Sequence, residues 1–497
     1  MRSPAIRSIS LLSSAIALAQ SGGTFTATGN MITNRTGHTA TLLLSGKVLI
    51  AGGATTSLVI TPNSVYPQQT ALASAEIYDP STGMFTATGS MTTARTWHSA
   101  TLLPDGRVLI AGGSGDPQAP TEGPLVSAEI YDPASGAFTA LGDVSRTTQP
   151  GLPTATLLNY GKVLITGIGP NARLYDPADS SFADAGAYSA PAPSGVGTAT
   201  LLADGRVLIT GIDVSNSGLA QIYDPFTNSF AGTGGADLPC GNGSMLQPGG
   251  GGVCWSIGID KVTLLPAGKV LITAYLDDYH VEPAFAEVYY PSTGIFTSIG
   301  KTIAPHEGST ATLLPDGTVL IAGSSLGVGV DAAVELYDPA SSKFVFAGNM
   351  VSGRSWHTAT LLPDGTVLLA GGETSTAEIY HPALLVPSPV LYSLPGGTQG
   401  AIWHNTTGQV ASPSSPALAG EVLAMYTNNL IEGGVIPPQV VIGGHLAEVL
   451  YFGDAPGYPG FFQLNFRVPN GVAPGSAVSV RLTYIERSSN EVTIGLQ

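Results

Sequence analysis

Arginine and histidine recur together at a fixed spacing in this chain of 497 residues. The spacing Arg-x-x-His occurs three times, at Arg35–His38, Arg95–His98 and Arg354–His357. A fourth, related segment carries His306 where the others carry arginine. Guanidinium and imidazole groups donate hydrogen bonds, and three imidazoles together can hold copper or zinc. These positions are therefore candidates for a polar-ligand site or a metal site.

Two tryptophans, Trp97 and Trp356, stand directly before the histidines of the second and third spacings. Hydrogen-bond donors beside an aromatic face suit a sugar or a small anionic ligand. A structural role is the alternative, in which arginine satisfies backbone carbonyls and tryptophan fills a gap between repeats. The candidate ligand-binding residues are Arg35, His38, Arg95, Trp97, His98, His306, Arg354, Trp356 and His357.

Three anchors, each present seven times, define the repeat that carries these residues. The first opens an Ala-Thr-Leu-Leu-like segment, at Ala40, Ala100, Ala155, Ala199, Val262, Ala311 and Ala359. The second opens a Tyr-Asp-Pro-like turn, at Tyr78, Tyr131, Tyr175, Tyr223, Tyr289, Tyr337 and Tyr380. The third is a Phe, at Phe25, Phe85, Phe138, Phe182, Phe230, Phe296 and Phe344. Each unit reads as four short antiparallel strands, and a period of about 50 residues is typical of a propeller blade.

The Phe anchor is displaced in phase, which indicates how the ring closes. The array begins with a lone strand at 24–29 and ends at Tyr380 without a following Phe strand. We expect the N-terminal strand to complete the seventh blade, since an unpaired sheet edge is unfavourable. In such a ring the four units with Arg or His at the entry are consecutive. They would form an arc on one side of the channel mouth.

The segment from Arg95 to Gly113, followed by Ser127 to Pro133, resembles a kelch repeat of the galactose-oxidase-like kind. The resemblance covers residues 24–382 and implies a seven-bladed propeller. The resemblance also suggests the activity of a copper–radical oxidase. The copper centre of that family uses a Tyr-His pair at a blade entry, a Tyr joined to a Cys, and a His from the C-terminal domain. Here Trp97 and Trp356 replace the tyrosine, and only His404 or His445 could supply the last ligand. We therefore predict no copper and no other cofactor.

The sequence pattern changes near Ser388, where the kelch anchors end. Six strand-like runs separated by Gly and Pro turns follow, at 420–426, 439–442, 447–452, 461–468, 477–484 and 491–494. This pattern is typical of an immunoglobulin-like sandwich. The run 441–469 resembles a C-terminal module of unknown role that recurs in secreted bacterial proteins. The predicted organisation is all-β, with a signal peptide at 1–19, a seven-bladed kelch-type propeller at 20–384 and an immunoglobulin-like β-sandwich at 385–497.

The signal peptide is predicted from Arg2 and Arg7, the apolar run 9–19 and the small residues before Gln20. It implies a protein that is secreted or held at the cell surface. Cys240 and Cys254 are then expected to form a loop-closing disulfide. The net charge of −16 disfavours nucleic acid, and no later run is long and apolar enough for a membrane span.

The long segments 54–73, 114–126 and 231–259 should share one face of the ring, opposite the tight Asp-Gly and Asp-Pro turns. We predict a binding protein that recognises carbohydrate or another extracellular ligand, such as a protein, on that loop face. The alternatives are a copper oxidase and a purely structural surface module. The sequence predicts neither the ligand nor the oligomeric state.

Overall fold

The computed structural model describes residues 22–61, 64–115, 125–144, 153–167, 169, 171–188, 197–212, 218–233, 257–276, 283–325 and 330–497. The predicted signal peptide and the predicted Cys240–Cys254 disulfide lie outside these residues. Every regular element within them is a β-strand. The described part of the chain contains no helix long and apolar enough to cross a membrane.

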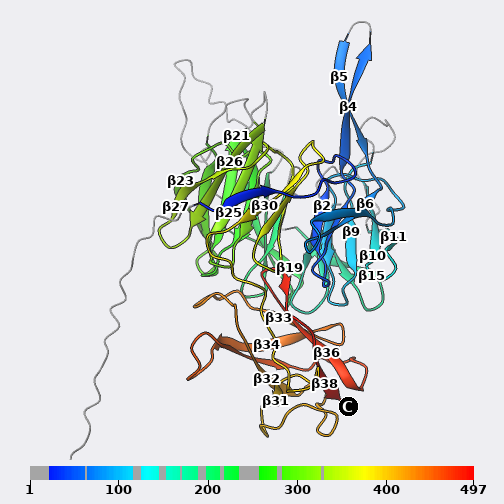
Figure 1. Ribbon diagram of the computed structural model, residues 1–497, viewed down its shortest axis with the longest axis vertical. Helices are drawn as coiled ribbons and strands as arrows, with labels where there is room; N and C mark the ends of the chain where they lie inside the picture. The colour runs from blue at the N-terminus through cyan, green and yellow to red at the C-terminus, as the bar shows by residue number, and fades with distance from the viewer. Residues whose placement is uncertain are drawn as a thin grey trace, which may run out of the picture.

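Seven four-stranded antiparallel sheets form a ring within the described residues, as the repeat predicts (Figure 1). The inner strands are β2 (Thr39–Leu42), β8 (Ser99–Leu102), β12 (Thr154–Leu157), β16 (Thr198–Leu201), β20 (Ile257–Leu264), β24 (Thr310–Leu313) and β28 (Thr358–Leu361). The second strands are β3 (Val48–Ala51), β9 (Val108–Ala111), β13 (Val163–Thr166), β17 (Val207–Ile212), β21 (Val270–Leu276), β25 (Val319–Ser325) and β29 (Val367–Ala370).

The outer half of each blade completes the sheet. The third strands are β6 (Ala75–Asp79), β10 (Ser127–Asp132), β14 (Asn171–Asp176), β18 (Gly218–Asp224), β22 (Phe285–Tyr290), β26 (Val330–Asp338) and β30 (Ala377–His381). The outermost strands are β7 (Met84–Ala87), β11 (Ala137–Asp143), β15 (Ser181–Ala187), β19 (Ser229–Gly232), β23 (Ile295–Lys301), β27 (Lys343–Asn349) and β1 (Thr24–Ala27). Blades are numbered one to seven from β2 to β28.

Strand β1 closes the ring by pairing antiparallel with β30 of blade seven, which confirms the expected closure (Figure 1). Phe25 lies opposite Tyr380 in the register, and their ring centroids are 5.0 Å apart. The other six blades repeat this Tyr–Phe pair inside a continuous chain segment, with centroids 4.6–5.1 Å apart. The Phe of the third anchor is therefore the side chain that packs on the Tyr of the second anchor.

The core lies between blades. Second strands such as Val48–Ala51 are buried at every residue, because both of their faces meet a neighbouring blade. Seven apolar clusters, one at each blade interface, run round the ring and include the interface between blades seven and one. Each inner strand also contacts the next one. Burying apolar area contributes about 25 cal/mol per Å², so these interfaces stabilise the ring.

The first long segment of the loop face is more regular than expected. Within this segment, β4 (Ala54–Thr61) and β5 (Ser64–Ala71) form a protruding hairpin that pairs with no other described strand (Figure 1). Its Thr- and Val-rich composition favours an extended backbone. The side chains of Leu58 and Ile60 are 68% and 77% exposed.

The C-terminal domain is a curled antiparallel sheet over its own apolar cluster. Its strands are β31 (Ile402–His404), β32 (Val422–Thr427), β33 (Gln439–Ile442), β34 (His445–Asp454), β35 (Phe462–Arg467), β36 (Gly475–Tyr484), β37 (Arg487–Ser488) and β38 (Val492–Leu496). The first residues of β34 pair with β33 and the rest pair with β35. This crossing strand bends the sheet around the core.

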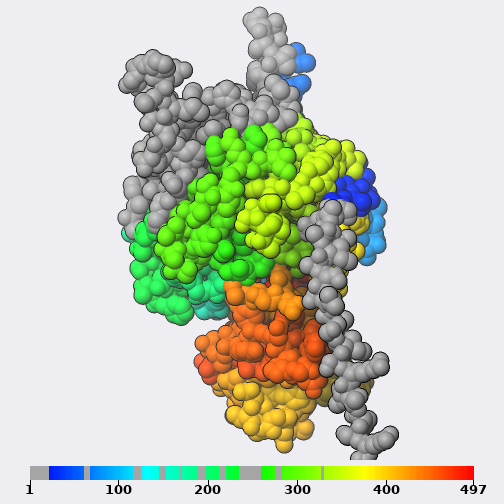
Figure 2. Space-filling model, turned by 90° about the vertical axis from the view of Figure 1, so that its left-hand side faces the viewer, coloured from blue at the N-terminus to red at the C-terminus, as the bar shows by residue number. Residues whose placement is uncertain are grey.

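The C-terminal domain packs against the face of the propeller that carries the tight turns (Figure 2). The Val435 N–H donates to the Pro266 carbonyl over 2.8 Å, and the Ser388 N–H donates to the Pro363 carbonyl over 2.7 Å. Ile485, at the tip of the β36–β37 turn, packs against the clusters between blades five and six and between blades six and seven. The loop face is left on the opposite side of the ring.

Candidate functional site

Each arginine of the Arg-x-x-His spacing is buried and bound within its own blade. Arg35 Nη2 lies 2.6 Å from Glu76 Oε1, and its Nη1 donates to the carbonyls of Gly52 and Ser74 over 2.9 Å. Arg95 and Arg354 repeat the arrangement with Glu129 and Glu378, both over 2.8 Å. These guanidinium groups are engaged by the fold. Ligand binding by them stays a prediction that the geometry does not favour.

The glutamate partner was missed in the sequence analysis. It lies two residues before the blade tyrosine and also accepts backbone N–H groups of the entry segment, as Glu76 does from Ile32 and Thr33. In blade six, His306 takes the place of arginine and its Nε2 lies 2.9 Å from Glu335. The signal was available, because an Ala-Glu-Ile-Tyr tetrapeptide recurs in the blades that carry arginine. We call this pairing of an entry-segment Arg or His with the blade Glu the entry clasp.

The three histidines of the spacing do not converge. Each imidazole reaches back to a threonine of the preceding blade over 2.9–3.2 Å: His98 to Thr39, His38 to Thr358, and His357 to Thr310. Burial, followed by the neighbouring arginine, lowers the pKa of His38 and His98 to about 3 and that of His357 well below its usual value. They are neutral rings that join adjacent blades.

The described residues contain no group of three or more His, Cys, Asp or Glu that could hold a metal ion. The two C-terminal histidines are also far from such a role. His404 is held by Glu421 at 2.5 Å and by the Ser415 carbonyl at 2.9 Å, and exposed His445 contacts the Gly443 carbonyl. The turn that reaches the channel from the C-terminal domain carries Ile485 and Glu486 instead. These residues do not fit the copper–radical centre that the resemblance implied.

Trp97 and Trp356 lie at the entries of blades two and seven, with ring centroids 5.1 Å apart and planes at 89°. Both have left-handed backbones, with φ of 55° and 54°, which is unusual for a large residue. Blades one and six have Gly37 and Gly308 at this position. A Cβ on Gly37 would lie 2.8 Å from the Trp97 ring, so glycine there makes room for the indole.

A second set of aromatic residues lies on the outer surface of the C-terminal sheet. The register places Trp403, Ala424, Asn465 and Tyr451 side by side across four strands. The next row along contains Tyr426, Gln463 and Gly453. Their neighbours Leu464 and Phe466 point inward and are fully buried. We call the group of Trp403, Tyr426, Tyr451, Tyr458, Gln463 and Asn465 the aromatic face.

The aromatic face combines exposed rings with amides. Tyr451 and Tyr458 are 45% and 63% exposed, and Tyr426 lies 6.3 Å from Tyr458 and 5.7 Å from Trp403 between ring centroids. The Tyr451 hydroxyl lies over Gly453, where a Cβ would come within 2.9 Å of it. The missing side chain lets the ring extend along the sheet. Gln463 donates to Asn465 over 3.0 Å, which leaves other amide donors and acceptors between the rings.

The chain matches no protein-family model and no curated protein sequence. Its fold is similar to that of a fungal alcohol oxidase of the AA5 family, solved in complex with copper. The TM-score is 0.56 with 14% sequence identity, over 96% of this chain and all of the other. At this identity the similarity shows a shared fold, and it covers both the propeller and the C-terminal domain.

Proposed function

We propose that this protein is a non-catalytic carbohydrate-binding protein and that the aromatic face of the C-terminal sheet contacts the sugar. The observation that carries the proposal is the row of solvent-accessible aromatic rings beside Gln463 and Asn465 on the outer surface of the sheet. The C–H face of a sugar packs on an aromatic ring, and its hydroxyls exchange hydrogen bonds with amides. The entry segments have fewer free hydrogen-bonding groups for a ligand, because their Arg and His side chains already have protein partners.

A neutral polysaccharide is the favoured ligand. No charged side chain belongs to the aromatic face, and two charges on its strands, Arg467 and Glu448, form an ion pair with each other over 2.9 Å. The chain as a whole carries −16, which repels polyanionic glycans. The predicted signal peptide agrees with an extracellular ligand of this kind.

A glycan array followed by isothermal titration calorimetry on the best neutral oligosaccharide tests the proposal. The variants Trp403→Ala and Tyr451→Ala should each weaken binding at least about tenfold, because exposed aromatic anchors dominate such contacts. The matched variants are Trp97→Ala and Trp356→Ala on the loop face, which the sequence predicted as the sugar contact.

The two pairs of variants separate the sites. Loss of affinity in the Trp403 and Tyr451 variants alone supports the aromatic face. Loss in the Trp97 and Trp356 variants alone overturns it in favour of the loop face. Absence of binding to any glycan on the array rejects the carbohydrate function itself.

A further inference from the structure

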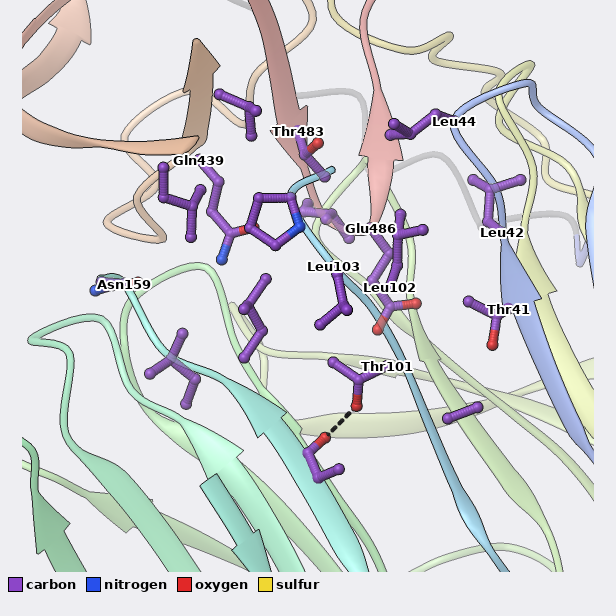
Figure 3. Close-up of a pocket in the computed structure, with 18 of the residues that line it drawn as sticks. Thr41, Leu42, Leu44, Thr101, Leu102, Leu103, Asn159, Gln439, Thr483 and Glu486 are labelled. Carbon is purple, nitrogen blue, oxygen red and sulfur yellow. Dashed lines mark hydrogen bonds between the residues drawn. The ribbon is translucent and has the colours of Figure 1, made fainter. Parts of the chain in front are cut away.

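A cavity of about 430 Å³ lies where the inner strands of the propeller meet the C-terminal domain (Figure 3). Blades one to five form one wall, and β33, β34, β36 and the β36–β37 turn form the other. Leucine and alanine dominate the propeller wall, as at Leu42, Ala100, Leu102, Leu157, Leu201 and Leu264. Small-molecule sites have this size and this mostly apolar lining.

Glu486 is the one charged residue among the described residues that line this cavity. Its side chain is exposed, and the space that it faces is this cavity. Desolvation by the surrounding protein raises the pKa of its carboxyl. The adjacent Arg487 does not line the cavity and donates to the Val386 carbonyl instead. A carboxylate with no ion-pair partner, at the wall of a mostly apolar cavity, is suited to bind a cationic ligand.

The turn that presents Glu486 is strained. Ile485 and Glu486 have φ of 47° and 61°, a geometry for which hairpins normally use Asn-Gly. Ile485 is explained by its packing against blades five to seven. Among the described residues no packing of this kind accounts for Glu486, and strained backbone positions gather at ligand sites.

We infer that this cavity binds a small organic ammonium ion with an apolar body, and that Glu486 is its counter-ion. The apolar walls would cover the body of the ligand, and the hydroxyl of Thr41 and the amide of Gln439 supply further polar contacts in the same chamber. A metal ion fits less well, because no other carboxylate and no imidazole stands among the described residues that line the cavity. The site is separate from the aromatic face and does not depend on carbohydrate binding.

Isothermal titration calorimetry with 2-phenylethylammonium and its neutral counterpart 2-phenylethanol tests the inference on the full chain. The protein should bind the ammonium ion at least about tenfold more tightly than the alcohol. One favourable contact between the ammonium group and the Glu486 carboxylate is enough for a tenfold difference in Kd. Glu486→Gln should remove this preference and leave the alcohol unaffected. The exposed Glu448→Gln is the matched control and should behave as the unchanged protein.

A second variant keeps the test decisive if Glu486→Gln does not fold. Thr483→Lys places an ammonium group of the chain itself in the wall of the cavity, so it should abolish binding of the added amine. Equal affinity for amine and alcohol in the unchanged protein overturns the inference. Unchanged amine binding in Thr483→Lys or in folded Glu486→Gln also overturns it.

Discussion

Two arcs of the same ring differ in how the chain enters a blade. In blades six, seven, one and two, a buried Arg or His of the entry segment pairs with a buried glutamate. In blade three the glutamate position holds Arg173, which pairs with Asp184 on the surface, where Asp184 is 68% exposed. Blade four has Gln221 there. The apolar clusters between blades nevertheless persist in both arcs.

The comparison shows that the residues that stabilise the sheet of a blade differ from those that hold its entry segment. The Tyr–Phe pair and the buried second strand occur in all seven blades and are enough for the sheet. Within the described residues, the entry clasp is found in blades six, seven, one and two, where the glutamate also binds backbone N–H groups of the entry segment. The clasp therefore fixes the position of Trp97 and Trp356 at the channel mouth.

The largest expected effect comes from breaking one clasp. Glu129→Ala leaves the Arg95 guanidinium buried without its carboxylate and should lower the free energy of unfolding by about 3–5 kcal/mol. Asp184→Ala in blade three removes an exposed partner and should cost about 1 kcal/mol or less. Denaturant midpoints of the two variants measure the contrast. Equal losses would show that the two arcs do not differ energetically.

A smaller effect concerns pH. The pKa of His98 falls to about 3 in the folded protein, below the usual value of 6.5, so between these values the unfolded chain binds a proton that the folded chain does not. The free energy of unfolding should therefore decrease as pH falls below 6.5, by about 1.4 kcal/mol per pH unit for this residue. His98→Gln should reduce that slope by the same amount in urea titrations.

His404 is the control with the opposite sign. Burial works against its charge, but the hydrogen bonds to Glu421 and Ser415 outweigh burial and raise the pKa of His404. Its contribution to stability is therefore present below pH 6.5 and is lost as pH rises through the folded pKa. His404→Gln should therefore lower the free energy of unfolding below pH 6.5. If this variant instead reduced the loss of stability with falling pH, as His98→Gln should, the assignment would be wrong.

The smallest effect tests where the arcs are alike. The turn before the outermost strand has glycine with positive φ in blades one, two and five, whereas Ser180 in blade three and Ser342 in blade six have φ of 59° and 55°. Ser180→Gly and Ser342→Gly should each stabilise the protein by up to about 1 kcal/mol, since they remove the left-handed strain. If only one of the two variants raised the thermal midpoint, the turns of the two arcs would differ as well as their entry segments.

The sequence predicts the ring well because its signals are periodic. Seven copies of each anchor and the phase of Phe25 were enough to pair the N-terminal strand with Tyr380. The three-residue strand β31 was missed because it is too short to show alternation. The site was harder. Arg and Glu of one clasp are 24–41 residues apart, and a pattern of single residues does not reveal which partner a buried cation takes.

The reach of Glu486 into the cavity could not be foreseen. Ile-Glu is not a turn signal, so the sequence gives no sign of a two-residue turn between β36 and β37. The aromatic face was also missed, although its strands were partly predicted. It depends on the registers of β31, β32, β35 and β34, and these are set by pairing between segments distant in the sequence.

Ring closure by β1 has a consequence for biosynthesis. Phe25 leaves the ribosome long before Tyr380, and at about 5–20 residues per second the delay is roughly 20–70 s. During that time the first strand has no partner, and afterwards the open edge of β30 accepts any strand of matching sequence. Two nascent chains at high local concentration can exchange their first strands, so domain-swapped dimers are the characteristic assembly error of this architecture.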